Sequence, residues 1–126
     1  MGTVGSNTPV QVINMTSIEP IPLPNDSWSR MVLTDKTVSG NRASLGYSIF
    51  RPGTVLSSVS HDVEEMAYVV AGKGELRLEN DVVTFEPHDA LFIPPSTWHA
   101  VANTGNEDLI MVFFFPFPDY PPTQRR

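Results

Sequence analysis

Cysteine is absent from this 126-residue chain, which excludes disulfides, thiolate metal ligands and a thiol nucleophile. Basic residues are scarce: eight Lys and Arg stand against 14 Asp and Glu, giving a formal net charge of −6. A partner with a phosphate backbone requires a basic stripe for counterion release, so nucleic-acid binding is excluded as a function class. Any chemistry must therefore use nitrogen and oxygen groups.

Long hydrophobic runs are also missing. No stretch reaches the roughly 18 consecutive apolar residues of a membrane-spanning helix, and the longest apolar run, residues 109–115, is typical of a buried strand. The first residues lack the basic head, apolar middle and small-residue cleavage site of a secretory signal. We therefore expect no membrane partner and a cytoplasmic location.

Proline and glycine are abundant, with 12 and 8 residues. From residue 42 onward they divide the chain into short β-prone runs, and no window shows a convincing helical stripe. We predict strands at residues 43–51, 65–70, 74–78, 81–85, 90–93, 98–103 and 109–115. The chain has the length of one domain, and this spacing is typical of an all-β barrel or sandwich of antiparallel sheets.

The two ends of the chain differ from the middle. Residues 1–25 carry several prolines without sustained periodicity, which is typical of an extended arm that can pair with a second subunit. For residues 1–8, a disordered tail is an equal alternative. Residues 26–115 are predicted to form the β-barrel, and the proline- and aromatic-rich tail at 116–126 is expected to be extended and to cap one end of it.

Only three histidines are present: His61, His88 and His99. In an extended chain His61 and Glu65 have the same parity, so the imidazole and the carboxylate can project to one face of a sheet. His99 follows a proline-containing turn and begins another predicted strand. His88 lies in a predicted tight bend, and we interpret it as an exposed turn residue.

The spacing of these residues resembles the two sequence motifs of the cupin superfamily over most of residues 45–115. The chain follows the first motif with Gly53, Val59-Ser60-His61, Glu65 and Gly72, and the second with His88, Pro94-Pro95-Ser96, His99 and Asn103. Every spacing is kept, but His88 and Ser96 stand where the second motif has glycines. The resemblance implies a jelly-roll barrel, or double-stranded β-helix, of two antiparallel sheets. By the same analogy we expect a homodimer formed through the N-terminal arm and an outer sheet face.

The metal site implied by the resemblance lacks one ligand, because Val59 stands where the first motif has its first histidine. The remaining set is His61, Glu65 and His99, which matches the two-histidine, one-carboxylate arrangement of non-haem Fe(II) oxygenases. We expect a divalent transition metal, Fe(II) first, with Mn, Ni or Zn as alternatives. Three protein ligands leave positions open for substrate, water or O₂. A metal-free pocket is the competing interpretation.

Five further residues are candidate contacts for a small-molecule substrate: Tyr47, Arg51, Val59, Phe92 and Trp98. The three aromatic residues fit core packing as well. Arg51 can hold an anionic group by a bidentate contact, or it can be a solvated strand end before a turn. Val59 places an apolar wall beside the metal. No catalytic residue beyond the metal ligands can be named from the sequence.

Three functional hypotheses follow. The first is a metal-dependent enzyme that acts on a small organic molecule, with a non-haem oxygenase or dioxygenase as the best single choice. The second keeps the metal but not the redox step, and makes the chain a lyase, isomerase or decarboxylase. The third is a non-enzymatic binding or sensor protein with a degenerate metal site. Fold alone does not choose among them, because one fold hosts many activities.

Overall fold

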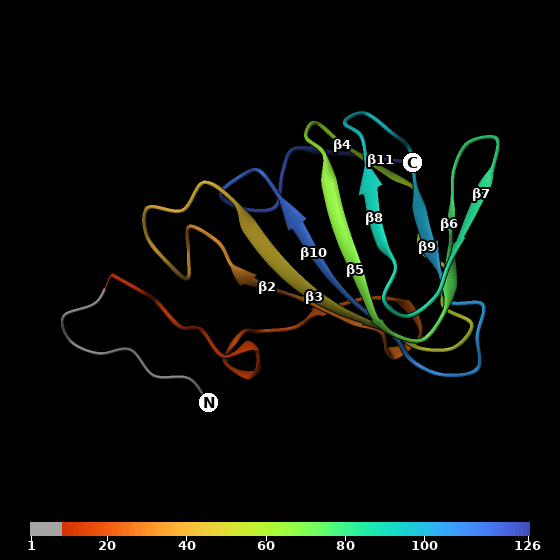
Figure 1. The fold of residues 1–126 in the computed structure, drawn as a ribbon, viewed down its shortest axis with the longest axis horizontal. Helices are drawn as coiled ribbons and strands as arrows, with labels where there is room; N and C mark the ends of the chain where they lie inside the picture. The colour runs from red at the N-terminus through yellow and green to blue at the C-terminus, as the bar shows by residue number, and fades with distance from the viewer. Residues whose placement is uncertain (1–8) are drawn as a thin grey trace.

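The computed structural model describes residues 9–126, so the first eight residues and the expectations for them lie outside the described residues. The chain runs through short strands and two 3₁₀ turns, at Met15–Ser17 and Pro24–Asp26 (Figure 1). The strands are β1 (Ile21–Pro22), β2 (Trp28–Leu33), β3 (Ser44–Phe50), β4 (Val59–His61), β5 (Glu65–Ala71), β6 (Gly74–Arg77), β7 (Val82–Phe85), β8 (Ala90–Ile93), β9 (Ala100–Ala102), β10 (Leu109–Phe115) and β11 (Thr123–Arg125). Within the described part of the chain, no helix is long and apolar enough to span a membrane.

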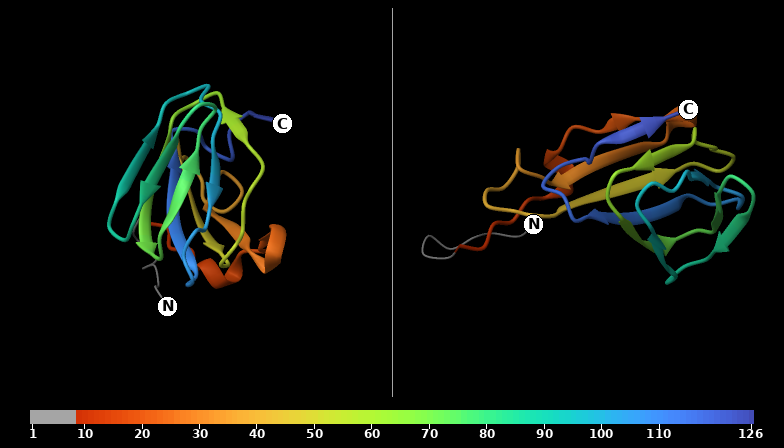
Figure 2. Two further views of the ribbon diagram at one scale, coloured as in Figure 1. Left: turned by 90° about the vertical axis from the view of Figure 1, so that its right-hand side faces the viewer. Right: turned by 90° about the horizontal axis from the view of Figure 1, so that it is seen from above.

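Two antiparallel sheets face each other around a common interior (Figures 1 and 2). One sheet has six strands in the order β1-β2-β3-β10-β5-β8. The other consists of β7-β6-β9 and the pair β11-β4, which are joined where Val59 and His99 exchange two backbone hydrogen bonds of 2.9 Å. The all-β jelly-roll barrel predicted from the sequence is confirmed.

The core follows from strand alternation, because successive side chains of a strand point to opposite faces of the sheet. In β3 every second residue is buried, from Ser44 to Phe50. Val69 of β5 and Leu109 of β10 are fully buried and pack with Leu76 from the opposite sheet. Burying a side chain of this size stabilises the fold by about 1.5–3 kcal/mol. These contacts hold the two sheets together at one end and leave a cavity between them.

The seven strands predicted from the sequence are all present, with boundaries that differ by at most two residues. The sequence did not predict β1, β2, β4 or β11. β1 has two residues, and β4 and β11 have three each, too few for a periodic pattern. In β2 the alternation is weak because Ser29, a polar residue, faces the interior. These four strands can therefore be recognised only from their pairing with neighbouring strands in the structure.

Both ends of the described chain are attached to the barrel. Gln11 exchanges two hydrogen bonds of 3.1 Å with the backbone of Ser39, and Ile21 and Pro22 pair with β2. At the other end β11 pairs with β4, with Thr123 opposite His61. The tail expected only to cap the barrel thus adds a strand next to a candidate ligand.

Besides Asn25 and Asp26 in the second 3₁₀ turn, two tight turns place a residue other than glycine in the left-handed region. His88 has φ 77° and Ser96 has φ 59°, at the two positions where the cupin motif has glycine. His88 is exposed, and its backbone N–H donates to the Val69 carbonyl at 2.8 Å. The prediction that His88 is an exposed turn residue is confirmed. The left-handed conformation costs about 1–2 kcal/mol for a residue with a side chain.

Candidate metal centre

Three separate elements supply the candidate ligands. His61 ends β4, Glu65 begins β5 and His99 immediately precedes β9. A bend at residues 62–64 turns the chain between β4 and β5, so His61 and Glu65 meet across a turn. The equal parity of the two positions had predicted instead that both side chains project from one face of a single extended segment. The backbone pairing of Val59 with His99 brings the third residue alongside.

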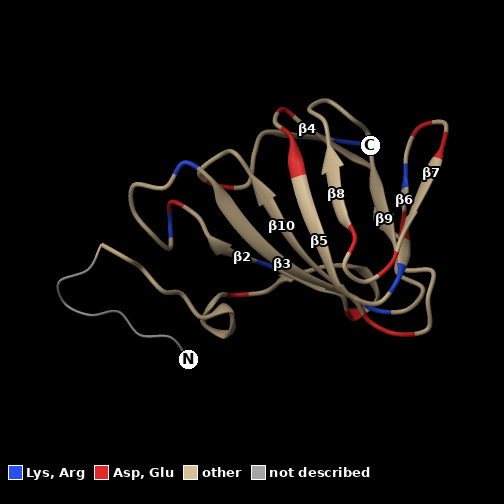
Figure 3. Cartoon of the chain, viewed as in Figure 1, with Lys and Arg blue, Asp and Glu red and all other residues tan. Residues whose placement is uncertain are grey.

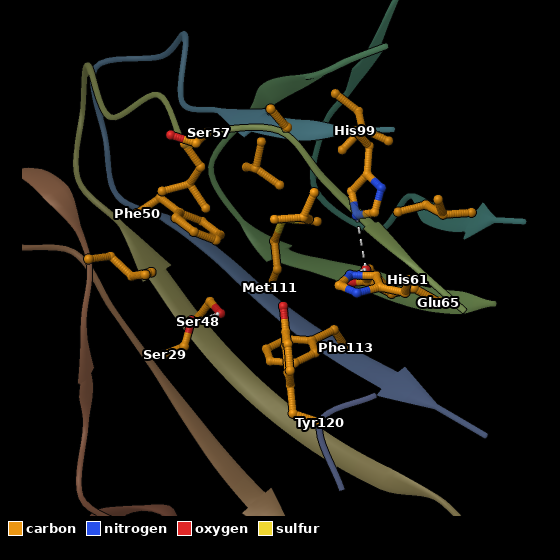
Figure 4. A pocket seen from close by; sticks show the side chains of 18 of the residues that line it. Ser29, Ser48, Phe50, Ser57, His61, Glu65, His99, Met111, Phe113 and Tyr120 are labelled. Carbon is orange, nitrogen blue, oxygen red and sulfur yellow. Dashed lines mark hydrogen bonds and ion pairs between the residues drawn. The ribbon is translucent and has the colours of Figure 1, made fainter. Parts of the chain in front are cut away.

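The three side chains converge in the interior (Figure 4). One ligand atom from each of them lies within 4.8 Å of the others. Glu65 Oε1 lies 3.2 Å from Nε2 of His61 and 3.2 Å from Nε2 of His99. The two histidine side chains are 3% and 5% exposed and that of Glu65 is 14% exposed. Within residues 9–126 this is the one group of three or more His, Asp or Glu side chains arranged to hold a metal ion.

The orientation of His61 is fixed by Thr123 in the C-terminal tail. The Thr123 hydroxyl donates to the Pro121 carbonyl at 2.8 Å and lies 2.7 Å from His61 Nδ1. A threonine hydroxyl has one proton, and a carbonyl can only accept, so Nδ1 of His61 carries the proton that Thr123 accepts. Nε2 of the neutral imidazole therefore presents its lone pair to the centre, which is the tautomer that a metal requires.

His99 is fixed in the same way by its own backbone turn. Its Nδ1 lies 2.8 Å from the carbonyl of Thr97, which can only accept a hydrogen bond. Nε2 of His99 again faces the centre. Two imidazole lone pairs and a carboxylate oxygen thus point at one another, and such a group is stabilised only by a shared proton or a cation.

The electrostatics of the site agree with this geometry. Burial raises the pKa of the Glu65 carboxyl, but its contacts with Nε2 of His61 and of His99, which a shared proton turns into hydrogen bonds in the metal-free site, outweigh burial and hold the pKa below its usual value. Burial also lowers the pKa of His99, but the hydrogen bond to Glu65 and the Thr97 carbonyl outweigh it, and the net pKa is raised. Without a metal, the site therefore favours a proton between His99 and Glu65, in the place that a cation would take.

The donor set fits a divalent transition ion. Two imidazole nitrogens and one carboxylate oxygen suit Fe(II), Mn(II), Ni(II) or Zn(II), whereas soft ions that need thiolate find no cysteine here. Thr123 and the Thr97 carbonyl supply the outer hydrogen bonds that ligating histidines usually make. The residues present thus fit the metal expected from the sequence.

The three residues lie on the wall of a cavity of about 480 Å³, a volume typical of small-molecule sites. Most of the wall is apolar and comes from both sheets, with Phe50, Met111 and Phe113 among its members. Tyr120 of the tail also lines it, with its ring 5.5 Å from that of His61 at 89°. The site therefore combines a polar centre with a mainly apolar chamber.

Of the five expected substrate contacts, only Val59 lines this cavity. Tyr47 and Phe92 point to the opposite face of the large sheet, because their strand neighbours Ser48 and Ile93 face inward. Tyr47 stacks on Trp28 with ring centroids 6.0 Å apart, and Phe92 is 60% exposed. The expectation that these two rings contact substrate in the cavity is therefore corrected by strand alternation.

Arg51 and Trp98 are also placed elsewhere. The Arg51 guanidinium donates to Asp108 at 2.7 Å at the end of β3, so it is the solvated strand end that the sequence allowed as an alternative. Trp98 packs under the guanidinium of Arg126, whose Cζ lies 4.1 Å from the ring centroid. Neither side chain is part of the cavity wall.

Sequence reasoning missed four residues that shape the site: Thr123, Tyr120, Ser29 and Ser48. Thr123 and Tyr120 lie in a proline-rich tail that carried no strand signal. Ser29 and Ser48 are small polar residues whose inward direction depends on the pairing of β2 with β3. No pattern in the sequence alone identifies them.

The fold and the site together define the class of protein: it is an all-β barrel in which two histidines and a carboxylate meet beside a small-molecule cavity. Residues 46–115, more than half of the chain, match the Cupin domain family, and the chain therefore belongs to that family.

Several known proteins are similar to this chain. It is 35% identical to polyketide synthase CurC of Streptomyces cyaneus over 85 residues, which cover 67% of this chain and 55% of CurC. It is 32% identical to 5-nitrosalicylic acid 1,2-dioxygenase of Bradyrhizobium sp over 66 residues, 52% of this chain and 32% of the enzyme. The chain thus spans about half the length of the first relative and about a third of the second.

The fold is also found in solved structures. The polyketide cyclase RemF from Streptomyces resistomycificus superposes with a TM-score of 0.77 over 92% of this chain and 84% of RemF. The sequences are 16% identical, so this likeness shows the fold alone.

Proposed function

We propose that this cupin is a metal-dependent enzyme that acts on a small, mainly apolar organic molecule inside the barrel, and that the reaction is oxygenation at non-haem iron. The observation that carries the proposal is the convergence of His61, Glu65 and His99 within 4.8 Å on the wall of the 480 Å³ cavity. Structural metal sites are closed by four protein ligands, whereas three leave positions open, as catalysis requires.

The residues of the chain have separate roles in this proposal. His61 and His99 would hold the ion through Nε2, and Glu65 through its carboxylate. Thr123 and the Thr97 carbonyl keep both imidazoles in the ligating tautomer. When bound, the ion would activate O₂ or polarise a substrate oxygen as a Lewis acid. Val59 and the aromatic wall exclude water and orient the apolar part of the substrate.

The two-histidine, one-carboxylate donor set favours oxygenation, because it is the ligand set of many Fe(II) oxygenases. The similarity to 5-nitrosalicylic acid 1,2-dioxygenase supports this choice. That enzyme is named for an aromatic acid, and the cavity here has an aromatic wall suited to a planar ring.

A second candidate is a metal-assisted reaction without redox change, in which a substrate carbonyl is polarised for carbon–carbon bond formation or cleavage. The similarity to polyketide synthase CurC favours it, since polyketides carry several carbonyl groups. The same residues would hold the metal in both candidate functions. The two therefore differ in the reaction catalysed and not in the metal site.

Metal analysis combined with oxygen uptake tests the proposal. Elemental analysis should find about one metal ion per chain in the parent and in His88→Asn, whose imidazole lies outside the site, and little in His99→Ala. The Fe(II) form, supplied with 2,6-dihydroxynaphthalene or salicylate as probes, should consume O₂ and the Zn(II) form should not. Turnover of a polycarbonyl probe by the Zn(II) form without O₂ uptake would favour the second candidate. Equal trace metal in all three proteins would overturn both.

A further inference from the structure

A pair of serine hydroxyls interrupts the apolar wall of the cavity. Ser29 of β2 lies directly opposite Ser48 of β3 in the sheet, and both side chains face the cavity. Their Oγ atoms are 2.7 Å apart. Figure 4 shows the pair on the β2–β3 wall, with Met111 and Phe113 between it and the candidate metal ligands.

The hydroxyl pair has hydrogen-bonding capacity to spare. Two hydroxyls bring two protons and four lone pairs, and the bond between them uses one of each. Among residues 9–126, neither Oγ makes another hydrogen bond. Ser48 is only 2% exposed. One O–H and several lone pairs thus face the cavity, where leaving them without a partner is unfavourable once water is displaced.

We propose that Ser29 and Ser48 form a second substrate anchor, which binds a hydroxyl or carbonyl oxygen of a ligand whose other oxygen lies at the metal centre. This inference rests on the proposed function, because the metal site holds the first oxygen. It adds a substrate class: an elongated, mainly aromatic molecule with oxygens at two separated positions, of which the oxygen at the serine pair is uncharged.

The charge of the cavity wall supports a neutral ligand end. Apart from the phenol of Tyr120, the ionisable wall residues are His61, Glu65 and His99 at the metal centre and the exposed Arg125 on β11, and none belongs to β2 or β3. A carboxylate placed at the serine pair would lose its hydration without gaining a cation, which is costly. A hydroxyl or carbonyl group loses less and finds both a donor and an acceptor. Ser29 also lies outside residues 46–115, so the family match assigns nothing to it.

Paired probes on the full-length, Zn(II)-loaded protein test the anchor without requiring turnover. We choose 2-naphthol against 2,6-dihydroxynaphthalene, and 2-hydroxyanthraquinone against 2,6-dihydroxyanthraquinone, so that two molecular lengths are covered. The second hydroxyl should improve affinity about 2- to 10-fold in the parent for at least one length. That gain should disappear in Ser29→Ala and in Ser48→Ala, while affinity for the mono-hydroxyl probe stays the same.

Ser57→Ala is the matched control, because Ser57 lines the same cavity away from the pair, and it should keep the gain. Thermal unfolding shows which variants are folded. Ser29 is half-buried, so we expect alanine to be tolerated there even if it is not tolerated at the buried Ser48. The inference is overturned if the second hydroxyl gives the parent no gain in affinity at either probe length. It is also overturned if Ser29→Ala and Ser48→Ala keep that gain, or if Ser57→Ala loses it equally. A parent that binds no zinc would overturn the proposed function instead, which the metal analysis of the same samples reveals.

Discussion

Two hydrogen bonds remote from the centre decide which nitrogen of each histidine faces the metal. For His61 the partner is Thr123, whose own proton is committed to Pro121. For His99 the partner is a backbone carbonyl, which no side-chain substitution removes. The two histidines therefore differ in how they can be tested: the tautomer of His61 depends on one replaceable hydroxyl.

Replacing Thr123 by valine keeps the shape of the side chain but removes the acceptor for His61 Nδ1–H. We expect metal affinity to fall about 10- to 100-fold, the usual effect of deleting such an outer hydrogen bond. Thr123→Ser should restore most of the affinity, because it keeps the hydroxyl. Competition with a zinc chelator measures both. Equal affinities in the parent and Thr123→Val would show that His61 is oriented by packing alone.

The metal-free site should make stability depend on pH in a defined window. The lowered pKa of Glu65 gives stability that is present above the carboxyl's ordinary pKa and is lost as pH falls through the folded value. The raised pKa of His99 gives stability that is present below the ordinary histidine pKa and is lost as pH rises through the folded value. The contribution of the pair is thus fully present at roughly pH 4.3 to 6.5.

Metal-free protein should accordingly melt at a higher temperature at about pH 6 than at about pH 8.5. Excess Zn(II) should stabilise the protein more at the higher pH, because protons compete with the ion for His99 and Glu65. Glu65→Gln should flatten the first difference and remove the zinc effect. Differential scanning calorimetry measures all three, and a pH dependence that survives Glu65→Gln would place its origin elsewhere.

The ligand residues could be predicted from sequence because family spacing survives even when local geometry is misjudged. His61 and Glu65 do meet, but across a bend and not along one strand face. Thr123 could not be predicted, since it reaches His61 from 62 positions away through a strand pairing with no sequence signal. Tyr47 and Phe92 were misplaced because chemistry alone does not tell which face of a strand is inward.

Strand alternation and turn residues explain how much of the fold the sequence revealed. The strands that pack across the core alternate cleanly or are wholly apolar, as in β3 and β10, and their positions were predicted within a residue. β2 and β11 border the cavity, so their inward residues include Ser29 and Thr123 and the pattern fails. All four strands that the sequence did not predict line the cavity, together with β3, β5 and β10, which it did predict.

Gly72 lies in the turn between β5 and β6, and replacing it tests why the motif requires a glycine at this position. Its φ is +80°, and a Cβ would lie 2.4 Å from the Asp108 carbonyl oxygen and 2.8 Å from Leu109 Cα. Gly72→Ala should lower the free energy of unfolding by more than about 3 kcal/mol. The alanine would be strained at this positive φ, and the backbone of Asp108 and Leu109 would also have to move.

Gly53→Ala provides a matched control. Gly53 has φ +84° but no atom within 4 Å of a built Cβ, so only the conformational strain applies and a loss of about 1 kcal/mol is expected. Urea unfolding of both variants measures the difference. Equal losses would show that the close approach at Gly72 relaxes without cost.

At the scale of the whole molecule, the outer face of the six-stranded sheet is unusually apolar. Met66, Tyr68 and Val70 alternate along β5 at 40–42% exposure, beside Phe92 on β8 at 60%. The strands β3, β8 and β10 carry no Lys, Arg, Asp or Glu, and the charged residues of the sheet are Arg30 on β2 and Glu65 at the start of β5 (Figure 3). Exposed patches of this kind mark interaction sites. The homodimer expected from the sequence stays a prediction, and we expect its interface to include this outer face of β5 and β8.

Sedimentation equilibrium tests that surface. The parent should sediment at about twice the 13.9 kDa chain mass at micromolar concentration, and Phe92→Glu should sediment as a monomer. Val82→Glu is the matched control: Val82 is 47% exposed but lies on β7, in the other sheet, and should leave the dimer intact. A monomeric parent, or equal effects of both substitutions, would contradict the assignment.

The central claim is that two imidazoles and one carboxylate share a cation inside the barrel. Anomalous X-ray scattering from crystals of the zinc-loaded protein measures this directly. We predict one strong peak about 2.0–2.2 Å from Nε2 of His61, Nε2 of His99 and a Glu65 carboxylate oxygen. A peak elsewhere, or none between these three side chains at saturating zinc, would contradict the claim.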